Sequence, residues 1–574
     1  MTDSRTAAAA LHQIAAYLEL AGENRFKIKA YQQAARALIT LNADDLGALP
    51  ARELDGTPGL GPATLAVVRD LIQLGESRYL EELRAATPEG LLEMLRVPGL
   101  GPQKIFKIYQ GLGVQSVQEL EEAARDGRLA KLPRFGARTA EKVLKSIAFM
   151  RESGALVLYP QALAASRPLL TMVLQHPGVV RADVAGSIRR HNEVVQDVDI
   201  AAGCRTDPAQ VAASFANAPG VKRVTGAGTA SIGINYVDGA RLDLHCVKDD
   251  EFAIARWRAT GSAGHVQQVV ARLLERGVHL DGDRLVDAKG KRLKVADEEA
   301  IYRAAGLACI PPEMREARGE VEAAARNALP QLVTVADIRG VLHCHSQYSD
   351  GKATIAEMAK AAADRGWSYL GISDHSEAAF YAGGLSRTAL LAQHEEIDAI
   401  NESQDRVRVL KGIEADILAD GRIDYDARVL ARFDYVIGSV HSRFAMEGDA
   451  MTERVLLAMD DPRLTILGHP TGRLLLNREP YAIDMEAVLQ KAAKKGVAVE
   501  LNADPHRLDI DWRLLQRARE LGVRIEIGPD AHSTAGLDYM GIGVGMARKG
   551  WLEAGDVLNC GSVDEVLAFA RARR

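Results

Sequence analysis

Seven short apolar runs in the C-terminal part of the chain each end in a histidine or a carboxylate. They read VLHCHS (341–346), YLGISDHS (369–376), VLKGIEAD (409–416), YVIGSVHS (435–442), TILGHP (465–470), VAVELNAD (497–504) and IEIGPDAH (525–532). Imidazole and carboxylate groups that gather in one place are ligands of divalent transition metals. Several such ions together activate an attacking oxygen and offset the charge of a leaving one. The composition predicts a multi-metal site that cleaves phosphoesters.

The stretches between these runs have helical spacing, so strands and helices alternate as they do in a parallel barrel. Barrels of this kind build their sites at the C-terminal ends of the strands. His343 and His345 are two residues apart and therefore share one face of their strand end. Cys344 points the other way, and we expect it to be a buried apolar residue. Residues 338–574 are thus predicted to form a parallel barrel whose strand ends converge on one site.

A second constellation suits nucleotidyl transfer. Gly186 and Ser187 form a turn after a strand-like run and offer a backbone N–H and a hydroxyl to a triphosphate. Asp197 and Asp199 lie two residues apart on a strand, so both side chains project from one face. Asp243 lies on a later strand and completes three carboxylates. Such a set predicts two divalent ions, one for the attacking oxygen and one for the leaving phosphate.

A glycine motif recurs in the first 150 residues, which have a helical pattern. It reads TPGLGPATLAVV (57–68), VPGLGPQKIFKI (97–108) and, more loosely, LPRFGARTAEKV (132–143). The turn leads into a helix whose free N–H groups can hold a phosphate oxygen. The motif resembles the helix-hairpin-helix, which binds a nucleic-acid backbone without reading its sequence. The glycines expected to contact DNA are Gly59, Gly61, Gly99 and Gly101.

Length, cysteines and charge set limits on the function. A chain of 574 residues is too long for one core and predicts several domains. Its five cysteines are scattered without a CxxC pair, which argues against a disulfide scaffold or a zinc ribbon. Residues 331–574 hold 29 Lys+Arg and 37 Asp+Glu, an acidic balance that fits a cation site. No apolar run approaches the roughly 20 residues of a membrane helix, and we expect neither a secretory signal nor a membrane partner.

The order of these motifs resembles a family X DNA polymerase joined to a PHP domain, the polymerase-and-histidinol-phosphatase phosphoesterase. Residues 1–330 look like the polymerase, with two hairpins, a GSIRR…DVD palm and a thumb with TGS at 260–262. Residues 338–574 resemble the PHP domain. The joining segment GLACIPPEMREARGEVEAA (306–324) is similar to that of the bacterial two-part enzymes called PolX. The resemblance covers essentially the whole chain.

This resemblance implies a multidomain α/β fold. It contains helical helix-hairpin-helix domains, a nucleotidyltransferase palm and thumb similar to those of DNA polymerase beta, and a distorted (β/α)7 PHP barrel. The expected divisions are 1–85 for a DNA-binding hairpin domain, 86–150 for fingers with the second hairpin, 151–250 for the palm, 251–312 for the thumb, 313–337 for a linker and 338–574 for the PHP barrel.

The resemblance also assigns roles in the polymerase half. The catalytic ligands of two Mg²⁺ or Mn²⁺ ions would be Asp197, Asp199 and Asp243. The residues that hold the incoming nucleotide would be Gly186, Ser187 and Arg190, with Arg241 near the primer end.

In the PHP half the resemblance implies nine ligands for three Mn²⁺ or Zn²⁺ ions. One ion would be held by His343, His345, Glu414 and Asp530, the second by Glu414, His441 and His469, and the third by Asp350, His375 and His532. We expect Asp374 to orient His375. The strand end that carries Glu500 is assigned no metal, while His265 and His506 remain open, the latter as a contact for substrate phosphate.

Several positions depart from the family pattern. Gln196 stands where a glycine is usual before the DxD. Arg258 and Ala259 replace an aromatic pair that excludes ribonucleotides, and Val266 replaces an asparagine near the nascent base pair. We therefore expect slower polymerisation or weaker sugar discrimination. The first hairpin helix, ATLAVVRDL, has no lysine, so deoxyribose-phosphate lyase activity through a Schiff base there is not supported.

Three functions compete. The leading hypothesis is a DNA repair enzyme with a gap-filling polymerase and a metal-dependent 3′–5′ exonuclease or 3′-end phosphoesterase. The second is a PHP phosphoesterase whose polymerase half is a degenerate DNA-binding module, and the third is a non-catalytic scaffold for DNA ends. We expect gapped or nicked DNA with 3′ ends and dNTPs as partners. A cytoplasmic, nucleoid-associated bacterial monomer is the default expectation.

Overall fold

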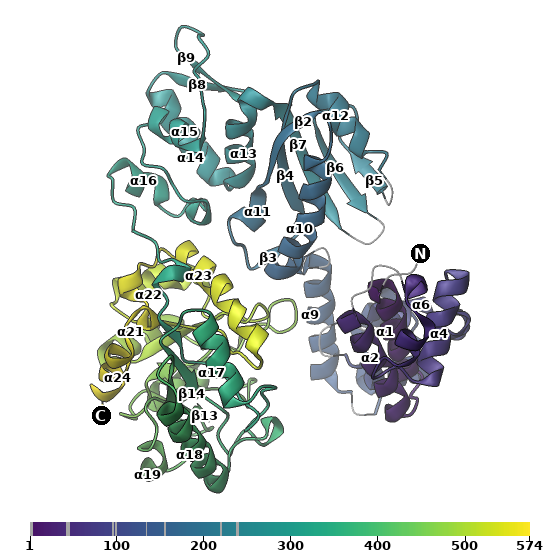
Figure 1. Cartoon of the computed structure of the whole chain (residues 1–574), viewed down its shortest axis with the longest axis vertical. Helices are drawn as coiled ribbons and strands as arrows, with labels where there is room; N and C mark the ends of the chain where they lie inside the picture. Colours follow the sequence, from purple (N-terminus) through teal and green to yellow (C-terminus); the bar gives the residue numbers. More distant parts are fainter. Residues whose placement is uncertain are drawn as a thin grey trace. The chain divides into compact units, whose positions relative to one another are not determined.

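The computed structural model describes residues 4–41, 46–94, 97, 100–133, 135–153, 156–218, 221–236 and 240–573. The chain divides into two compact units, Met1–Ala155 and Leu156–Arg574 (Figure 1). Each unit is described by itself. Among the described helices, none is both long and apolar enough to cross a membrane.

The first unit is helical and holds two hydrophobic cores. Leu11, Leu38 and Val68 belong to one core, and Leu100 and Ile105 belong to the other. Serine side chains cap two of the helices and glycines in the left-handed conformation end two others, as expected for short helices joined by tight turns. The helices are α1 (Ser4–Leu20), α2 (Arg25–Leu41), α3 (Ala51–Asp55), α4 (Pro62–Leu74), α5 (Arg78–Ala86), α6 (Glu89–Met94), α7 (Pro102–Leu112), α8 (Val117–Arg125) and α9 (Ala137–Ser153).

The second unit begins with a five-stranded sheet in the order β2-β4-β7-β6-β5. Its central pair, β4 and β7, is parallel, and the other pairs are antiparallel. Leu242 and Leu244 are buried in the core, so Asp243 between them faces the other side of the sheet. The strands are β2 (Val179–Val184), β4 (Val198–Cys204), β5 (Val221–Thr225), β6 (Ser231–Tyr236) and β7 (Arg241–Lys248), and the helices that accompany them are α10 (Tyr159–Leu174), α11 (Gly186–Arg189) and α12 (Pro208–Phe215).

Next along the chain is a helical region with one small hairpin. The indole of Trp257 donates a hydrogen bond of 3.2 Å to the hydroxyl of Tyr302 in its core. The segment 313–337, expected as a linker, packs into this same core through Met314 and Val321. Its elements are α13 (Phe252–Thr260), α14 (Ala263–Glu275), β8 (Val278–Asp281), β9 (Arg284–Asp287), α15 (Glu298–Ala304) and α16 (Glu320–Ala325).

The C-terminal region is built from parallel strands that alternate with helices (Figure 1). All pairs in the sheets β10-β11-β12 and β13-β14-β15-β16-β17 are parallel. Parallel bridges join His375 to Glu414 and Cys344 to Ala531, which links the first sheet to both ends of the second. Cys344 is fully buried.

Each of the seven apolar runs contributes to this layer of strands, and one run supplies both β12 and β13. The strands are β10 (Gly340–Val341), β11 (Tyr369–Ile372), β12 (Arg408–Lys411), β13 (Glu414–Asp416), β14 (Ile437–Ser439), β15 (Ile466–Leu467), β16 (Ala498–Asn502) and β17 (Ile525–Gly528). The helices are α17 (Ile355–Asp364), α18 (Arg387–Ser403), α19 (Ala427–Leu430), α20 (Gly448–Ala458), α21 (Met485–Lys495), α22 (Leu515–Glu520), α23 (Met540–Lys549) and α24 (Val563–Arg571).

Candidate metal centres and nucleotide site

The C-terminal ends of the parallel strands bring the nine predicted PHP residues into one cluster. His343 and His345 follow β10, Asp350 lies in the next loop, His375 follows β11, Glu414 begins β13, His441 follows β14, His469 follows β15, and Asp530 and His532 follow β17. Most of these side chains are buried, whereas Asp350 and His532 are 38% and 36% exposed and mark the open side of the cluster.

Glu414 lies at the centre of the imidazoles. Its Oε1 is 2.9 Å from His469 Nε2 and 3.3 Å from His441 Nε2, and its Oε2 is 2.9 Å from His375 Nδ1. Burial alone would raise the pKa of this carboxyl, but His441, His375 and His343 outweigh burial and hold the pKa well below its usual range. Glu414 is therefore an ionised carboxylate that more than one metal ion could share.

Two aspartates complete the cluster. Asp530 Oδ1 lies 3.2 Å from His345 Nε2 and 3.6 Å from His343 Nε2, and Asp350 Oδ1 lies 3.3 Å from His532 Nε2. Three sets of ligand atoms fall close enough together to hold an ion. They are His345, Asp350, His375 and His532; His343, His345 and Asp530; and His375, Glu414 and His441.

These sets differ in detail from the assignment by resemblance. His345 takes part in two sets, and His375 lies with Glu414 and His441 as well as with Asp350. His469 belongs to none of the three sets, although it lies close to Glu414.

The donor atoms fit divalent metals. His343 Nε2, His469 Nδ1 and both ring nitrogens of His345 are buried without a hydrogen-bond partner in the part of the chain that the structure describes. Burial, with the neighbouring His375, lowers the pKa of His345 to about 3, and burial with Arg507 lowers that of His469 to about 4. Neutral imidazoles with free nitrogens are the form that binds a metal.

Two carboxylates that the sequence left without a role support the ligands. Glu500 accepts 2.5 Å hydrogen bonds from His343 Nδ1 and from the backbone N–H of His469. Asp416 accepts a 2.7 Å bond from His441 Nδ1. Such partners fix the ring orientation and leave the opposite nitrogen for an ion. The sequence contained a sign of this role, because Glu500 and Asp416 both lie in apolar strand runs, where a buried charge needs a partner.

Arg507 is a further residue that sequence reasoning missed. Its Nε lies 3.4 Å from Asp530 Oδ2, and the side chain is 19% exposed. His469 and Asp530 both have positive φ angles, 22° and 50°. Strained backbone of this kind concentrates at functional sites.

Asp374 is fully buried and is bonded to the loop that follows His345. Its carboxylate accepts hydrogen bonds from the backbone and hydroxyl of Ser346, from the hydroxyl of Ser349 and from the amide of Gln393. These bonds anchor the loop that leads to Asp350. The expectation that Asp374 also orients His375 stays a prediction.

The palm brings its three predicted carboxylates together. Asp199 and Asp243 are paired in register on β4 and β7, and Asp197 lies just before β4. The three offer oxygens close enough to share an ion. Burial first, and then the charge of Asp199, raise the pKa of Asp197 and of Asp243. Crowded carboxylates that repel one another in this way fit divalent cations.

The turn after β2 lies directly against these carboxylates. Gly186 has a φ of +61°, and a Cβ at this position would lie 1.7 Å from Asp199 Oδ2, so only glycine fits. The Ser187 hydroxyl is buried without a hydrogen-bond partner among the described residues. Arg241 NH2 lies 4.0 Å from Asp197 Oδ2.

Arg190, the predicted triphosphate ligand, already has partners. Its Nε donates a 2.9 Å hydrogen bond to Glu316 Oε1, and its NH1 donates a 2.6 Å bond to the carbonyl of Thr260. The neighbouring Arg189 is paired with Glu298.

The structure shows the surroundings of the residues that depart from the family pattern, and of His265. Arg258 donates hydrogen bonds to the carbonyl of Gly282 and to Asp283, which ties α13 to the β8–β9 turn. Gln196 is exposed. His265, left open by the sequence, is buried between Glu320 at 2.7 Å and the Tyr302 hydroxyl at 2.9 Å, so it has a structural role. Val266 packs against the surrounding apolar core.

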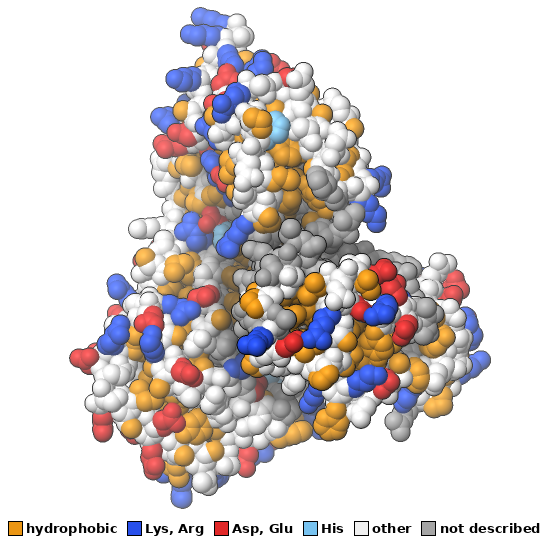
Figure 2. All heavy atoms as spheres, turned by 45° about the vertical axis from the view of Figure 1, so that its right-hand side comes forward, with side chains coloured by type: hydrophobic (Ala, Val, Ile, Leu, Met, Phe, Trp, Pro, Cys, Tyr) orange, Lys and Arg blue, Asp and Glu red, His pale blue; other side chains and the backbone are white. Residues whose placement is uncertain are grey.

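The described glycines of the first two motifs lie at the starts of helices in the first unit. Gly59 has a φ of +98°, and a Cβ there would meet that of Ala37 at 3.3 Å. Gly61 and Gly101 are the N-caps of α4 and α7, each followed by proline. Gly99 lies outside the described residues. On the face that Figure 2 shows, basic, acidic and hydrophobic side chains are interspersed, which suits phosphate binding by backbone N–H groups.

Three family models match the chain. The PHP domain covers residues 342–504, a SAM-like helix-hairpin-helix tandem covers 91–148, and the DNA polymerase beta thumb covers 255–316. The DNA polymerase/3′-5′ exonuclease PolX of Bacillus subtilis (strain 168) is 36% identical over 565 residues, which is 98% of each chain. The chain belongs to the PolX family.

The PHP part of this PolX chain has further relatives. A probable phosphatase of Syntrophotalea carbinolica is 34% identical over 166 residues, 28% of this chain and 64% of that protein. A probable phosphatase of Clostridium acetobutylicum is 32% identical over 171 residues, 28% of this chain and 63% of that protein.

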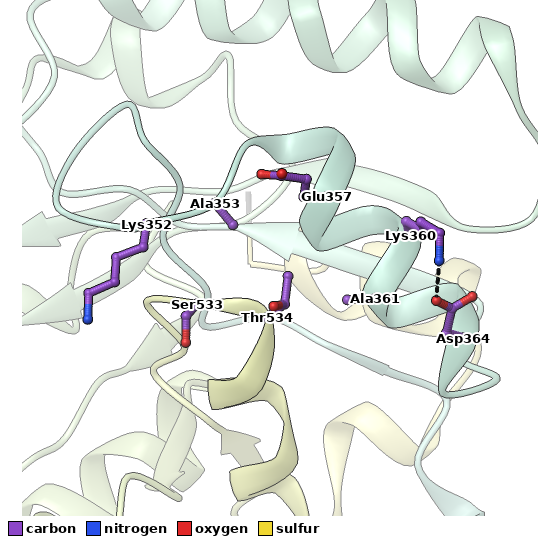
Figure 3. Close-up of a pocket in the computed structure, with 8 residues that line it drawn as sticks. All are labelled: Lys352, Ala353, Glu357, Lys360, Ala361, Asp364, Ser533 and Thr534. Carbon is purple, nitrogen blue, oxygen red and sulfur yellow. Dashed lines mark hydrogen bonds and ion pairs between the residues drawn. The ribbon is translucent and has the colours of Figure 1, made fainter. Parts of the chain in front are cut away.

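A groove of about 470 Å³ opens beside the metal-type cluster of this PolX chain. It begins where the backbone N–H of Lys352 donates a 2.8 Å bond to the carbonyl of His532. Figure 3 shows Lys360 paired with Asp364 along its wall, while Lys352 extends separately. His506 is 64% exposed and contacts Asp504.

Proposed function

We propose that this PolX-family chain is a DNA repair enzyme that fills gaps with its polymerase half. Its PHP domain would act as a metal-dependent 3′–5′ exonuclease or 3′-end phosphoesterase in base excision or break repair. One observation carries the proposal: two separate clusters of metal-type ligands, one of three carboxylates in the palm and one of imidazoles and carboxylates at the strand ends of the PHP domain. The relative from Bacillus subtilis carries both activities in its name.

In the palm, Asp197, Asp199 and Asp243 would hold two Mg²⁺ or Mn²⁺ ions. When bound, these ions would supply the positive charge that favours attack by a primer 3′ oxygen and departure of pyrophosphate. The glycine at 186 leaves the carboxylates room beside the turn. Gly186, Ser187 and Arg190 would hold the triphosphate, and Arg241 would lie near the primer end.

In the PHP domain, the nine clustered residues would hold three Mn²⁺ or Zn²⁺ ions, with Glu414 shared. When bound, the ions would activate water and offset charge on the leaving oxygen. With the ions bound, Glu500 and Asp416 would accept the Nδ1 protons of His343 and His441 and leave each Nε2 to the cluster. The exposed edge at Asp350 and His532 is where a DNA 3′ end would enter.

The intact carboxylate set in the palm favours an active polymerase over a degenerate DNA-binding module. We also propose the six divisions given above, with 313–337 packed onto the thumb, and a monomer that acts on chromosomal DNA in the cytoplasm. The helix-hairpin-helix glycines would hold the DNA backbone on either side of a gap.

Two measurements test this proposal. Purified protein should extend a primer across a gapped duplex with dNTPs and Mn²⁺, and Asp243→Asn should lower extension at least a hundredfold because the metal set is incomplete. Elemental analysis after dialysis should find about three tightly held ions for each chain, and fewer in His375→Ala. Absence of primer extension by the wild-type protein would contradict the polymerase assignment, and metal-free wild-type protein would contradict the PHP assignment.

A further inference from the structure

We propose that Lys549 of the PHP domain is a positioning residue for the polymerase. It would act through Glu316 on Arg190, and the inference rests on the proposed role of Arg190 as a triphosphate ligand. Lys549 ends helix α23 and is 1% exposed. A buried lysine is costly unless its ammonium is fully engaged, so its partners indicate why it is there.

Among the described residues, the ammonium of Lys549 donates its hydrogen bonds to groups that precede the PHP domain in the chain. Its Nζ donates a 3.1 Å bond to the carbonyl of Arg190 and a 2.9 Å bond to Asn192 Oδ1, and it pairs with the carboxylate of Glu316. The ammonium also lies 4.5 Å from the centre of the Trp512 ring. Lys549 thus forms hydrogen bonds with the residues that end the turn beginning at Gly186.

Glu316 is shared by two cations. Arg190 Nε and Lys549 Nζ both donate to its Oε1. Burial lowers the pKa of Lys549 to about 8 against the opposing charge of Glu316, so the ammonium is mostly protonated at neutral pH. One carboxylate between two cations leaves a net positive charge at this turn. Without Lys549, Glu316 would neutralise Arg190 alone and compete with a triphosphate for its guanidinium.

The next residues of the same segment are also held by the PHP domain. Glu193 accepts hydrogen bonds from Trp512 Nε1 at 3.1 Å and from Arg513 NH1 at 3.2 Å. His191 lies so close to helix α23 that a Cβ on Gly545 would meet its Nδ1 at 2.1 Å. The PHP domain therefore holds the backbone between the turn that begins at Gly186 and Asp197. Through Glu316 it also sets the charge that surrounds Arg190.

The test compares full-length wild type with Lys549→Met and with Lys494→Met, which removes an exposed lysine of the same domain. Steady-state gap filling should show KM for dNTP raised about tenfold in Lys549→Met, within the coupling typical of contacting residues, with kcat within about twofold. Exonuclease rate on the same preparation should be unchanged, which also reports folding. Lys549→Arg should restore KM, and Lys494→Met should match wild type.

A double variant separates positioning from loss of structure. Adding Glu316→Gln to Lys549→Met removes the carboxylate that would otherwise neutralise Arg190, so KM should return toward the wild-type value. If Lys549→Met does not fold, Asn192→Ala and Glu316→Gln are measured in its place. The KM for dNTP of Glu316→Gln must then be equal to or below the wild-type value, and a higher value overturns the inference. Wild type that extends primers while Lys549→Met keeps its KM overturns the inference; wild type that never extends overturns the proposed function.

Discussion

At the scale of single residues, the carboxylates of the PHP domain divide into three roles. Glu414 and Asp530 lie beside the ring nitrogens of His343 and His345, Glu500 accepts a hydrogen bond from His343 Nδ1, and Glu526 does neither. All four are buried, so burial does not separate them. The four carboxylates differ instead in the groups that lie next to them. For Glu526, this difference has a consequence for stability.

Glu526→Gln should make the domain more stable at neutral pH. Burial, and then the charge of Glu500, raise the pKa of Glu526 well above its ordinary value of 4.5. The folded protein keeps this proton above pH 4.5 while the unfolded chain releases it, so wild-type stability falls as pH rises. Glutamine is neutral in both states. Its advantage in the free energy of unfolding should grow from pH 4.5 by up to about 1.4 kcal/mol for each pH unit.

Denaturant unfolding of wild type and Glu526→Gln between pH 4 and pH 8 measures this difference. Glu453→Gln, the same change at an exposed glutamate, should leave the pH profile as in wild type. Parallel profiles for wild type and Glu526→Gln would show that Glu526 is ionised in the folded protein.

Arg258→Tyr should lower ribonucleotide incorporation several-fold relative to dNTP. The resemblance implies an aromatic side chain at this position beside the sugar, and here Arg258 is paired with Asp283 instead. Single-nucleotide extension with matched rNTP and dNTP gives the selectivity. Asp283→Asn breaks the same ion pair without adding a ring and should leave selectivity unchanged. Equal selectivity in Arg258→Tyr and wild type would remove the sugar-discrimination argument.

At the scale of elements, strand ends were predictable and side-chain partners were not. Apolar runs that end in ligands gave the positions of His343, His375 and Asp530, because period and turn residues mark where a strand stops. The bonds from Ser346 and Gln393 to Asp374 could not be read in this way, since they depend on how a loop and helix α18 pack in the folded domain. The charges of segment 313–337 indicate a linker, and the sequence does not show that Met314 and Val321 of this linker pack into a core.

The turn between β2 and α11 is the element on which the palm site depends most. Gly186→Ala places a methyl group against Asp199 and also strains a left-handed backbone. We expect gap filling to fall at least a hundredfold, because the carboxylate must move from its place beside Asp243, whereas exonuclease activity should remain. Primer extension and 3′-end degradation on the same DNA measure both effects.

Gly228→Ala is the matched control for this turn. Its φ is +86°, so the backbone strain is similar, but nothing lies within 4 Å of the added Cβ. It should lose stability without a comparable loss of polymerisation. If Gly228→Ala lowers gap filling as much as Gly186→Ala, strain accounts for the effect and contact with Asp199 does not.

At the scale of the whole molecule, one compact unit carries both ligand clusters. The palm carboxylates and the PHP cluster both lie within Leu156–Arg574, joined by contacts such as those of Lys549 and Glu193. The sequence predicted both clusters but not this junction, because its partners are more than 300 positions apart in the chain. Two sites built from separate residues should be separable by mutation even though their scaffolds are joined.

The most direct test of two independent sites uses one gapped duplex with a labelled primer. Wild type, Asp197→Ala and His343→Ala are incubated with Mn²⁺, with and without dNTPs, and the primer length is followed over time. If the two sites are independent, Asp197→Ala loses extension but still shortens the primer, while His343→Ala extends it and no longer shortens it. Shortening at the wild-type rate by His343→Ala, or loss of both activities in either variant while it remains folded, would contradict two independent sites.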